Sequence, residues 1–189
     1  MLIRRAELAD APAIARVHVD SWRTTYRGIV PDDALAALSY EQREQTWRRA
    51  ISHADSVRCV YVAEANGGNL IGFASGGPER SGDQVYGGEL YAIYLLAEHQ
   101  RCGAGRRVAL AIASHLLQGG LTSMLVWVLA ENPARSFYAK LGGQQVYERV
   151  ETIGGARLVE VAYGWRDLRA LAPQGGSRDD ESWKQDQLI

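Results

Sequence analysis

A short run of glycine and basic residues, HQRCGAGRR at residues 99–107, separates two stretches with regular patterns. The stretch before it, ELYAIYLLA, is rich in the aromatic and branched side chains that favour a strand. The stretch after it, VALAIASHLLQ, spaces Val108, Ile112 and Leu116 as on the apolar face of a helix. The run is therefore predicted to be a turn from a strand into a helix. Such a turn directs free backbone N–H groups and the positive end of the helix dipole toward an anion.

The length of 189 residues suits one domain with a sizeable core. We expect this domain at residues 1–168 and a flexible C-terminal tail at 169–189, because the tail is charged, rich in glycine and poor in large apolar side chains. Cys59 and Cys102 lie in unrelated contexts, so the sequence predicts neither a disulfide framework nor a metal site.

The charge balance argues against two classes of partner. With 21 basic and 22 acidic side chains, the formal net charge is −1, so the chain lacks the basic field typical of nucleic-acid and anionic-membrane binders. No stretch approaches the ~18 apolar residues of a membrane span, and the N-terminus lacks the apolar core of a signal peptide. We therefore expect a cytoplasmic protein with no nucleic-acid or membrane partner.

The rest of the chain alternates strand and helix signals. Asp10 is expected to cap the first helix, and Ser39 and Gln42 have the spacing of a capping box. The expected order is the strand LIRRAEL, helices after Asp10, Pro31 and Ser39, the strands VRCVYVAEA, LIGFASG and VYGGELYAIYLLA, the helix after the glycine turn, the strand LTSMLVWVLA, the short helix PARSFYAKL, and the strands QQVYERV and RLVEVAYGW. This order predicts an α/β fold: a mostly antiparallel mixed sheet of about six or seven strands with helices on both faces.

Two common phosphate-binding motifs do not match the glycine turn. A P-loop requires lysine and a hydroxyl residue after its last glycine, but two arginines follow Gly105. A dinucleotide fingerprint requires a third glycine where Val108 stands. The remaining pattern, Gln/Arg-x-x-Gly-x-Gly/Ala, is filled by Gln100, Gly103 and Gly105. It resembles the acetyl-CoA pyrophosphate motif of the GCN5-related N-acetyltransferases.

Taken alone, the glycine pattern is also compatible with an ordinary turn in which glycine supplies only conformational freedom. A second segment strengthens the resemblance. The segment WVLAENPARSFYAKLGG presents Asn132, Tyr138 and Leu141-Gly142 in the order found in that family, downstream of the turn. Together with the element order, the resemblance covers about residues 2–166. The sequence departs from the family pattern at Ala97, Cys102 and Gly143.

The resemblance implies acetyl-CoA as cosubstrate, no metal, and splayed strands at the site. The backbone groups that it matches to the pantetheine arm are those of Ile93, Tyr94 and Leu95. The residues that it matches to the pyrophosphate loop are Gln100, Arg101, Cys102, Gly103, Ala104, Gly105 and Arg106. Asn132 matches a side chain that hydrogen-bonds the pantetheine, and Tyr138 matches the phenol that protonates the departing thiolate. Tyr138 is otherwise a packing aromatic on a helix face.

The acceptor side is less defined by the pattern. Glu89 lies where many relatives place the carboxylate that takes the amine proton, although a salt-bridged or exposed strand glutamate fits equally well. The histidine that rivals it is His18. By analogy with the helix-to-helix loop of relatives, the candidate substrate contacts are His18, Ser21, Trp22, Thr25 and Tyr26. A core tryptophan beside a solvated loop is the alternative.

The resemblance implies an acetyl-CoA-dependent N-acetyltransferase that moves an acetyl group directly to a primary amine, with a small molecule as the favoured acceptor. Three alternatives stay open: a protein or peptide amine as acceptor, an acyl-CoA-binding regulatory module without turnover, and a structural protein whose helices near Trp47 mediate dimerisation. A homodimer is also compatible with the sequence.

Overall fold

The computed structural model describes residues 1–171, so most of the predicted tail, residues 172–189, lies outside the described residues. Every strand and helix that the sequence predicts is present. The elements are β1 (Leu2–Arg5), α1 (Ala11–Thr25), α2 (Asp32–Ala36), α3 (Tyr40–Ser52), β2 (Cys59–Glu64), β3 (Leu70–Pro78), β4 (Gly88–Leu95), α4 (Ala104–Gln118), β5 (Met124–Leu129), α5 (Arg135–Lys140), β6 (Gln144–Ile153) and β7 (Ala156–Trp165), with single 3₁₀ turns at Leu8–Asp10, Ala97–His99 and Leu168–Ala170. Within residues 1–171, no helix combines the length and apolar character needed to cross a membrane.

The strands form one seven-stranded sheet in the order β1-β2-β3-β4-β5-β7-β6. All neighbours are antiparallel except β4 and β5, which are parallel. These two strands pair only where Gly88 lies opposite Met124 and Glu89 opposite Leu125. Both strands continue beyond that point, so they part from each other. The predicted mixed sheet with splayed strands is confirmed.

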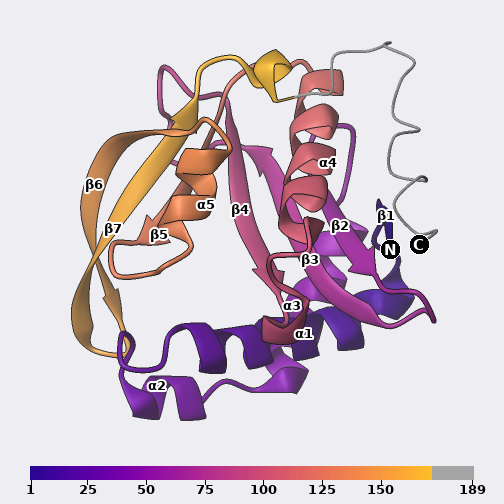
Figure 1. The fold of residues 1–189 in the computed structure, drawn as a ribbon, viewed down its shortest axis with the longest axis vertical. Helices are drawn as coiled ribbons and strands as arrows, with labels where there is room; N and C mark the ends of the chain where they lie inside the picture. The colour runs from indigo at the N-terminus through magenta and orange to yellow at the C-terminus, as the bar shows by residue number, and fades with distance from the viewer. Residues whose placement is uncertain (172–189) are drawn as a thin grey trace, which may run out of the picture.

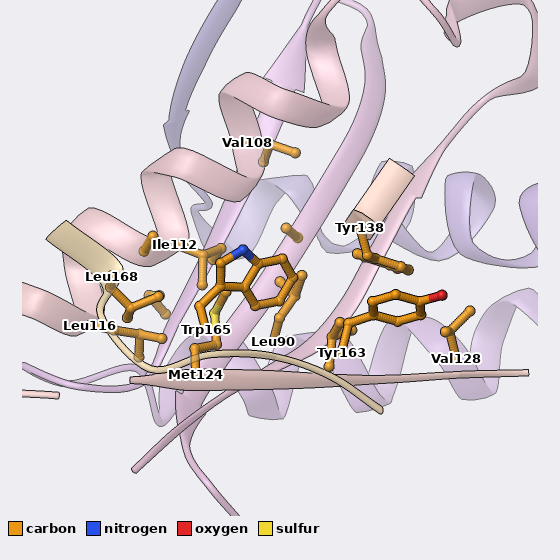
Figure 2. Close-up of a cluster of buried hydrophobic side chains, with 14 of the residues drawn as sticks. Leu90, Val108, Ile112, Leu116, Met124, Val128, Tyr138, Tyr163, Trp165 and Leu168 are labelled. Carbon is orange, nitrogen blue, oxygen red and sulfur yellow. The ribbon is translucent and has the colours of Figure 1, made fainter. Parts of the chain in front are cut away.

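Helices cover both faces of the sheet, as Figure 1 shows. Alternate side chains of β2 point to opposite faces of the sheet. Cys59 packs with α4, whereas Val60 and Val62 pack with α1 and α3. On the α4 side, Ile112 and Leu116 meet Leu90 and Trp165 in a continuous apolar cluster (Figure 2). The apolar spacing seen in the sequence is therefore the core-facing stripe of α4.

The two predicted helix caps have different outcomes. The Ser39 hydroxyl accepts the Gln42 N–H at 3.2 Å and begins α3, which confirms that cap. Asp10 does not cap α1, which corrects the prediction made for it. Its carboxylate accepts two hydrogen bonds from the Arg4 guanidinium, at 2.7 and 2.9 Å, and one from the Glu7 N–H. A carboxylate held by these donors is not free to bond the first turn of α1.

The hairpin of β6 and β7 closes one end of the molecule. Its turn at Gly154 packs so closely on Ala34 of α2 that no Cβ would fit, and Gly154 has a φ of +58°. Ile153 and Leu158 pack against the cluster that contains Tyr26 and Leu35. In Figure 1 this turn lies at the lower left, beside the chain that leads into α2. The hairpin, α1 and α2 are thus joined by apolar contact.

Candidate active site

The edge of β4 beyond Glu89 presents unpaired backbone groups. The Leu96 N–H donates to the Ile71 carbonyl at 2.9 Å, across from β3. In an antiparallel ladder, successive residues turn their N–H and C=O groups to opposite sides. The backbone groups of Ile93 and Leu95 therefore face away from β3, toward the side where β5 has parted. Tyr94, two residues before Leu96, has the same orientation as Leu96, so its N–H and C=O face β3 and not the parted side, which corrects the prediction made for its backbone.

A bulge lies at the point where the strands part. Ser75 pairs with Ala92 and Gly76 with Leu90, so Tyr91 has no opposite residue on β3. The Tyr91 ring and the Glu89 carboxylate lie on the same side of β4, as residues two apart on a strand do, and the guanidinium of Arg80 contacts both. Bulges of this kind often re-aim side chains beside functional sites.

Glu89 is buried, with 3% of its surface exposed, and its carboxylate is bound by Arg80. The Arg80 Nε donates to Oε2 at 2.9 Å, the Arg80 backbone N–H donates to Oε2 at 3.3 Å, and Nη2 donates to Oε1. The guanidinium also lies 4.4 Å from the centre of the Tyr91 ring. No sequence motif indicates a role for Arg80, because it lies in an irregular loop. The role of Glu89 as a base stays a prediction.

The glycine turn has the geometry of an anion-binding loop. Gly103 has a φ of +84° and begins α4, and Arg101 also has a positive φ of 61°. The first bond inside the helix runs from the Arg107 N–H to the Gly103 carbonyl at 3.1 Å. Within residues 1–171, the first-turn N–H groups of Ala104, Gly105 and Arg106 consequently have no helical acceptor. The turn therefore offers the array of donors that a pyrophosphate requires.

Two predicted site residues meet at the carbonyl of Leu95. The Ser21 hydroxyl of α1 and the Gln100 side-chain amide each donate to this oxygen at 3.2 Å. Gln100 thus ties the glycine turn to β4, and Ser21 ties the predicted acceptor helix to the predicted cofactor strand. The adjacent Cys102 is exposed, and its Sγ lies 3.0 Å from the His99 carbonyl oxygen.

Tyr138 extends from α5 into the apolar cluster beneath α4, where Figure 2 shows it beside Tyr163 and Val128. Its ring centre lies 5.9 Å from that of Tyr163. Burial raises the pKa of the Tyr138 phenol above its ordinary value, and Tyr26 raises it further. The phenol therefore keeps its proton at neutral pH. Among residues 1–171, its hydroxyl has no hydrogen-bond partner.

Asn132 connects the two halves of the predicted site. Its Nδ2 donates to the Tyr26 hydroxyl at 3.3 Å, while its Oδ1 accepts the Ala134 N–H at 2.8 Å at the start of α5. Burial also raises the pKa of the Tyr26 phenol. A predicted cofactor residue and a predicted acceptor residue are thus in direct contact, although 106 positions separate them in sequence.

His18 lies in an aromatic cluster between α1, α3 and β4. Its Nδ1 accepts the Trp47 Nε1–H at 3.1 Å, and its ring stacks on Tyr94 with centres 5.0 Å apart. Burial, aided by Arg43, lowers the pKa of His18 from 6.5 to about 3. The His18 imidazole is therefore neutral at neutral pH. Trp47 is buried in this cluster, and dimerisation through the helices near it stays a prediction.

The predicted acceptor residues largely come together. Trp22 packs on Tyr26 with ring centres 4.7 Å apart, and both lie near Tyr94. Thr25 shares this face of α1 by its spacing from His18 and Ser21, but its side chain forms no hydrogen bond within residues 1–171. In the same part of the chain, no group of three or more His, Cys, Asp or Glu side chains is arranged to hold a metal ion.

Comparison with known proteins places this geometry among acetyltransferases. Residues 83–151 match the family described as FR47-like protein. The N-acetyltransferase YuaI of Bacillus subtilis is 48% identical, over 89% of this chain and 95% of its own length. PaiA N-acetyltransferase from Thermoplasma acidophilum, solved with coenzyme A, superposes with a TM-score of 0.67 at 22% identity, over 85% of this chain and 96% of that one. The structure of yncA from Salmonella typhimurium with acetyl-CoA gives a TM-score of 0.67 at 21% identity, over 95% and 98%.

Proposed function

Since the chain belongs to the GCN5-related N-acetyltransferase family, we propose that this N-acetyltransferase moves an acetyl group from acetyl-CoA directly to a primary amine of a small molecule. Two of its structural neighbours were solved with coenzyme A or acetyl-CoA, which supports the donor. The cytoplasmic location and the homodimer stay predictions.

The contact between the β6–β7 hairpin and α2 is the observation that favours a small molecule as the acceptor. The hairpin turn at Gly154 contacts Ala34, and Leu158 packs with the Tyr26 cluster. The predicted acceptor residues lie on this side of the sheet, at the parting of β4 and β5. A polypeptide acceptor needs an open path for the chain on both sides of its amine. A small amine needs no such path, so the closed end favours it.

The residues present fit the proposed donor. The first-turn N–H groups of α4, at Ala104, Gly105 and Arg106, would hold its pyrophosphate. The backbone groups of Ile93, which face away from β3, would hold its pantetheine arm as an added strand. At Leu95 the N–H alone would take part, because the carbonyl already accepts hydrogen bonds from Ser21 and Gln100. When bound, acetyl-CoA supplies the activated acetyl group. The other predicted loop residues and Asn132 stay predictions, and Asn132 would exchange its bond to Tyr26 for one to the pantetheine.

The carboxylate of Glu89, the proposed base, has one lone-pair position that no hydrogen-bond donor in residues 1–171 occupies. An ionised carboxylate offers about four lone-pair positions. Arg80 occupies three of them, two on Oε2 and one on Oε1 of Glu89. The remaining position on Oε1 can orient a single water or the amine itself, and through it Glu89 would take the amine proton. Arg80 thus fixes the direction from which the proton is accepted.

The proposed acid lies among the apolar side chains of the other face. Leu90 belongs to the cluster that holds Tyr138, while Glu89, next to it on β4, faces the opposite side. Base and acid would therefore act on the parted strands from opposite faces of the sheet. The Leu95 N–H would polarise the acetyl carbonyl, and the Tyr138 hydroxyl would stabilise the departing sulfur by donating a hydrogen bond to it.

The experiment that tests this function is incubation of the protein with acetyl-CoA and separate acceptors, with free thiol release recorded. We expect release with small primary amines and little with a peptide that has a free N-terminus. Release with the peptide alone would instead favour the protein or peptide acceptor. Binding of acetyl-CoA without release for any acceptor would favour the regulatory module.

A further inference from the structure

Two helices place four side chains in a square beside the proposed acceptor site. On α1, His18 and Trp22 are one turn apart, and on α3, Arg43 and Trp47 are one turn apart. The helices run antiparallel here, because Trp47 bonds to His18 while the Arg43 guanidinium lies 6.0 Å from the centre of the Trp22 ring. We call these four residues the α1–α3 cluster.

The α1–α3 cluster holds two buried hydrogen-bond donors without acceptors. Trp47 can only donate, so the Nδ1 of His18 is the acceptor, and neutral His18 carries its proton on Nε2. This Nε2–H is buried and has no partner among the described residues. The Nε1–H of Trp22 is buried and unpartnered in the same way. A buried donor without an acceptor is costly, so two of them one turn apart call for an oxygen-bearing partner.

The charge around the α1–α3 cluster indicates which oxygen-bearing group this is. Arg43 forms no ion pair with any residue in 1–171, and its side chain is half-buried. The nearby acids are engaged elsewhere: Asp20 accepts the Tyr40 hydroxyl, and Glu44 pairs with Arg48. The cluster therefore has one uncompensated positive charge and two neutral N–H donors. This combination suits an anion with several acceptor oxygens, such as a carboxylate.

We propose that the α1–α3 cluster binds a carboxylate of the acceptor, so that the substrate is an amino acid or a close relative with an amine and a carboxylate. The inference rests on the proposed function, because it concerns the acceptor of the same site. Tyr94 stacks on His18, and the next residue, Leu95, presents its backbone toward the parted strands. A molecule with its carboxylate on the α1–α3 cluster thus has its amine near the proposed acetyl position. Arg43 covers Trp22 and must turn aside as the carboxylate enters.

Matched pairs of acceptors test this inference. Suitable pairs are L-phenylalanine with 2-phenylethylamine and L-leucine with 3-methylbutylamine, which differ only by the carboxylate. Thiol release from acetyl-CoA gives kcat/KM for each acceptor, corrected for the fraction of unprotonated amine at the assay pH. We expect the amino acid to exceed its amine by about tenfold or more. Equal values, or a faster amine, would overturn the inference while leaving the proposed function in place.

Substitutions in the α1–α3 cluster test whether the preference for the amino acid over its amine depends on this cluster. W22F keeps the ring but removes the N–H, and R43Q removes the charge. Both are expected to reduce the ratio of the two kcat/KM values on the order of tenfold. The matched control is R49Q, which removes an exposed charge from the same helix and should keep the ratio. An unchanged ratio in both W22F and R43Q means that water alone satisfies the donors and contradicts the inference. No thiol release with any amine would overturn the proposed function itself.

Discussion

The guanidinium of Arg80 donates hydrogen bonds to both carboxylate oxygens of the buried Glu89, although the Arg80 side chain itself is largely exposed. This ion pair joins an irregular loop to the strand position at which β4 and β5 part. It leaves a single acceptor position on Oε1. The proposed base is therefore oriented by a residue that need not touch the substrate.

Replacing Arg80 tests this orientation. In R80Q the buried carboxylate loses its charged partner, so we expect the free energy of unfolding to fall by about 1–3 kcal/mol, and kcat to fall more than KM changes. R80K keeps the charge but cannot form the bidentate interaction with the carboxylate. Relative to R80Q, it should therefore restore the free energy of unfolding more fully than kcat. Urea unfolding and steady-state kinetics provide both readouts. If R80Q retains wild-type kcat, Arg80 has no part in orienting Glu89.

Glu89 itself is tested by E89Q, which keeps the size of the side chain and removes its proton-accepting capacity. We expect turnover with a small amine to fall on the order of a hundredfold, with the affinity for acetyl-CoA retained. Steady-state rates and a calorimetric titration with acetyl-CoA measure the two quantities. Turnover within a factor of two of wild type would show that another group accepts the proton.

Tyr138 is tested by Y138F, which preserves the ring in the apolar cluster. Because burial raises the pKa of this phenol far above the ~8.5 of a thiol, complete proton transfer to a thiolate is uphill, and much of its contribution comes as a hydrogen bond. We expect turnover to fall about tenfold to a hundredfold, with little change in acetyl-CoA affinity. A variant with unchanged turnover would leave Tyr138 as a packing residue.

The lowered pKa of His18 predicts that the stability of the protein depends on pH. Its pKa is about 3 in the folded chain and ~6.5 when unfolded, so between these values only the unfolded chain binds the proton. The free energy of unfolding therefore decreases as pH falls through this window, by up to about 1.4 kcal/mol per pH unit from this group. In H18N, urea unfolding between pH 7 and pH 4.5 should show a shallower loss. H53Q, at an exposed histidine, should keep the wild-type slope. Parallel curves for H18N and wild type would contradict the assignment.

Gly103 tests the glycine turn. Valine at this position meets a φ of +84°, which L side chains rarely adopt, so G103V should distort the donors of the turn. G120V is a matched control, because Gly120 has a φ of +85°, equally open space, and lies beyond the other end of α4. Thermal unfolding with and without acetyl-CoA compares them. We expect ligand stabilisation to survive in G120V and to be largely lost in G103V. Equal stabilisation of both variants would exclude the turn as the pyrophosphate site.

The fold could be predicted because its signals are local. The spacing of Val108, Ile112 and Leu116 gave α4, and the run of aromatic and branched residues before the turn gave β4. The wrong cap at Asp10 arose because Arg4, which binds its carboxylate, lies on a separate strand. A local capping preference cannot anticipate such competition.

The site was predicted less completely, because its contacts join distant parts of the chain. Ser21 meets Leu95, and Trp47 meets His18, through the packing of α1 on β4 and α3. Neither pair has a sequence pattern that would reveal it. Arg43 and Arg80 carry no motif, so only the folded chain shows that one is without an acidic partner in residues 1–171 and the other binds Glu89.

The most direct test of the central claim is amine-dependent release of free thiol from acetyl-CoA, with the product identified by mass spectrometry. We expect thiol to appear only when a small primary amine is present, in a one-to-one ratio with an acetylated amine. G103V and E89Q should each slow the formation of both products together. Thiol release that is independent of the amine, or the absence of an acetylated amine under conditions in which acetyl-CoA stabilises the protein, would contradict this claim.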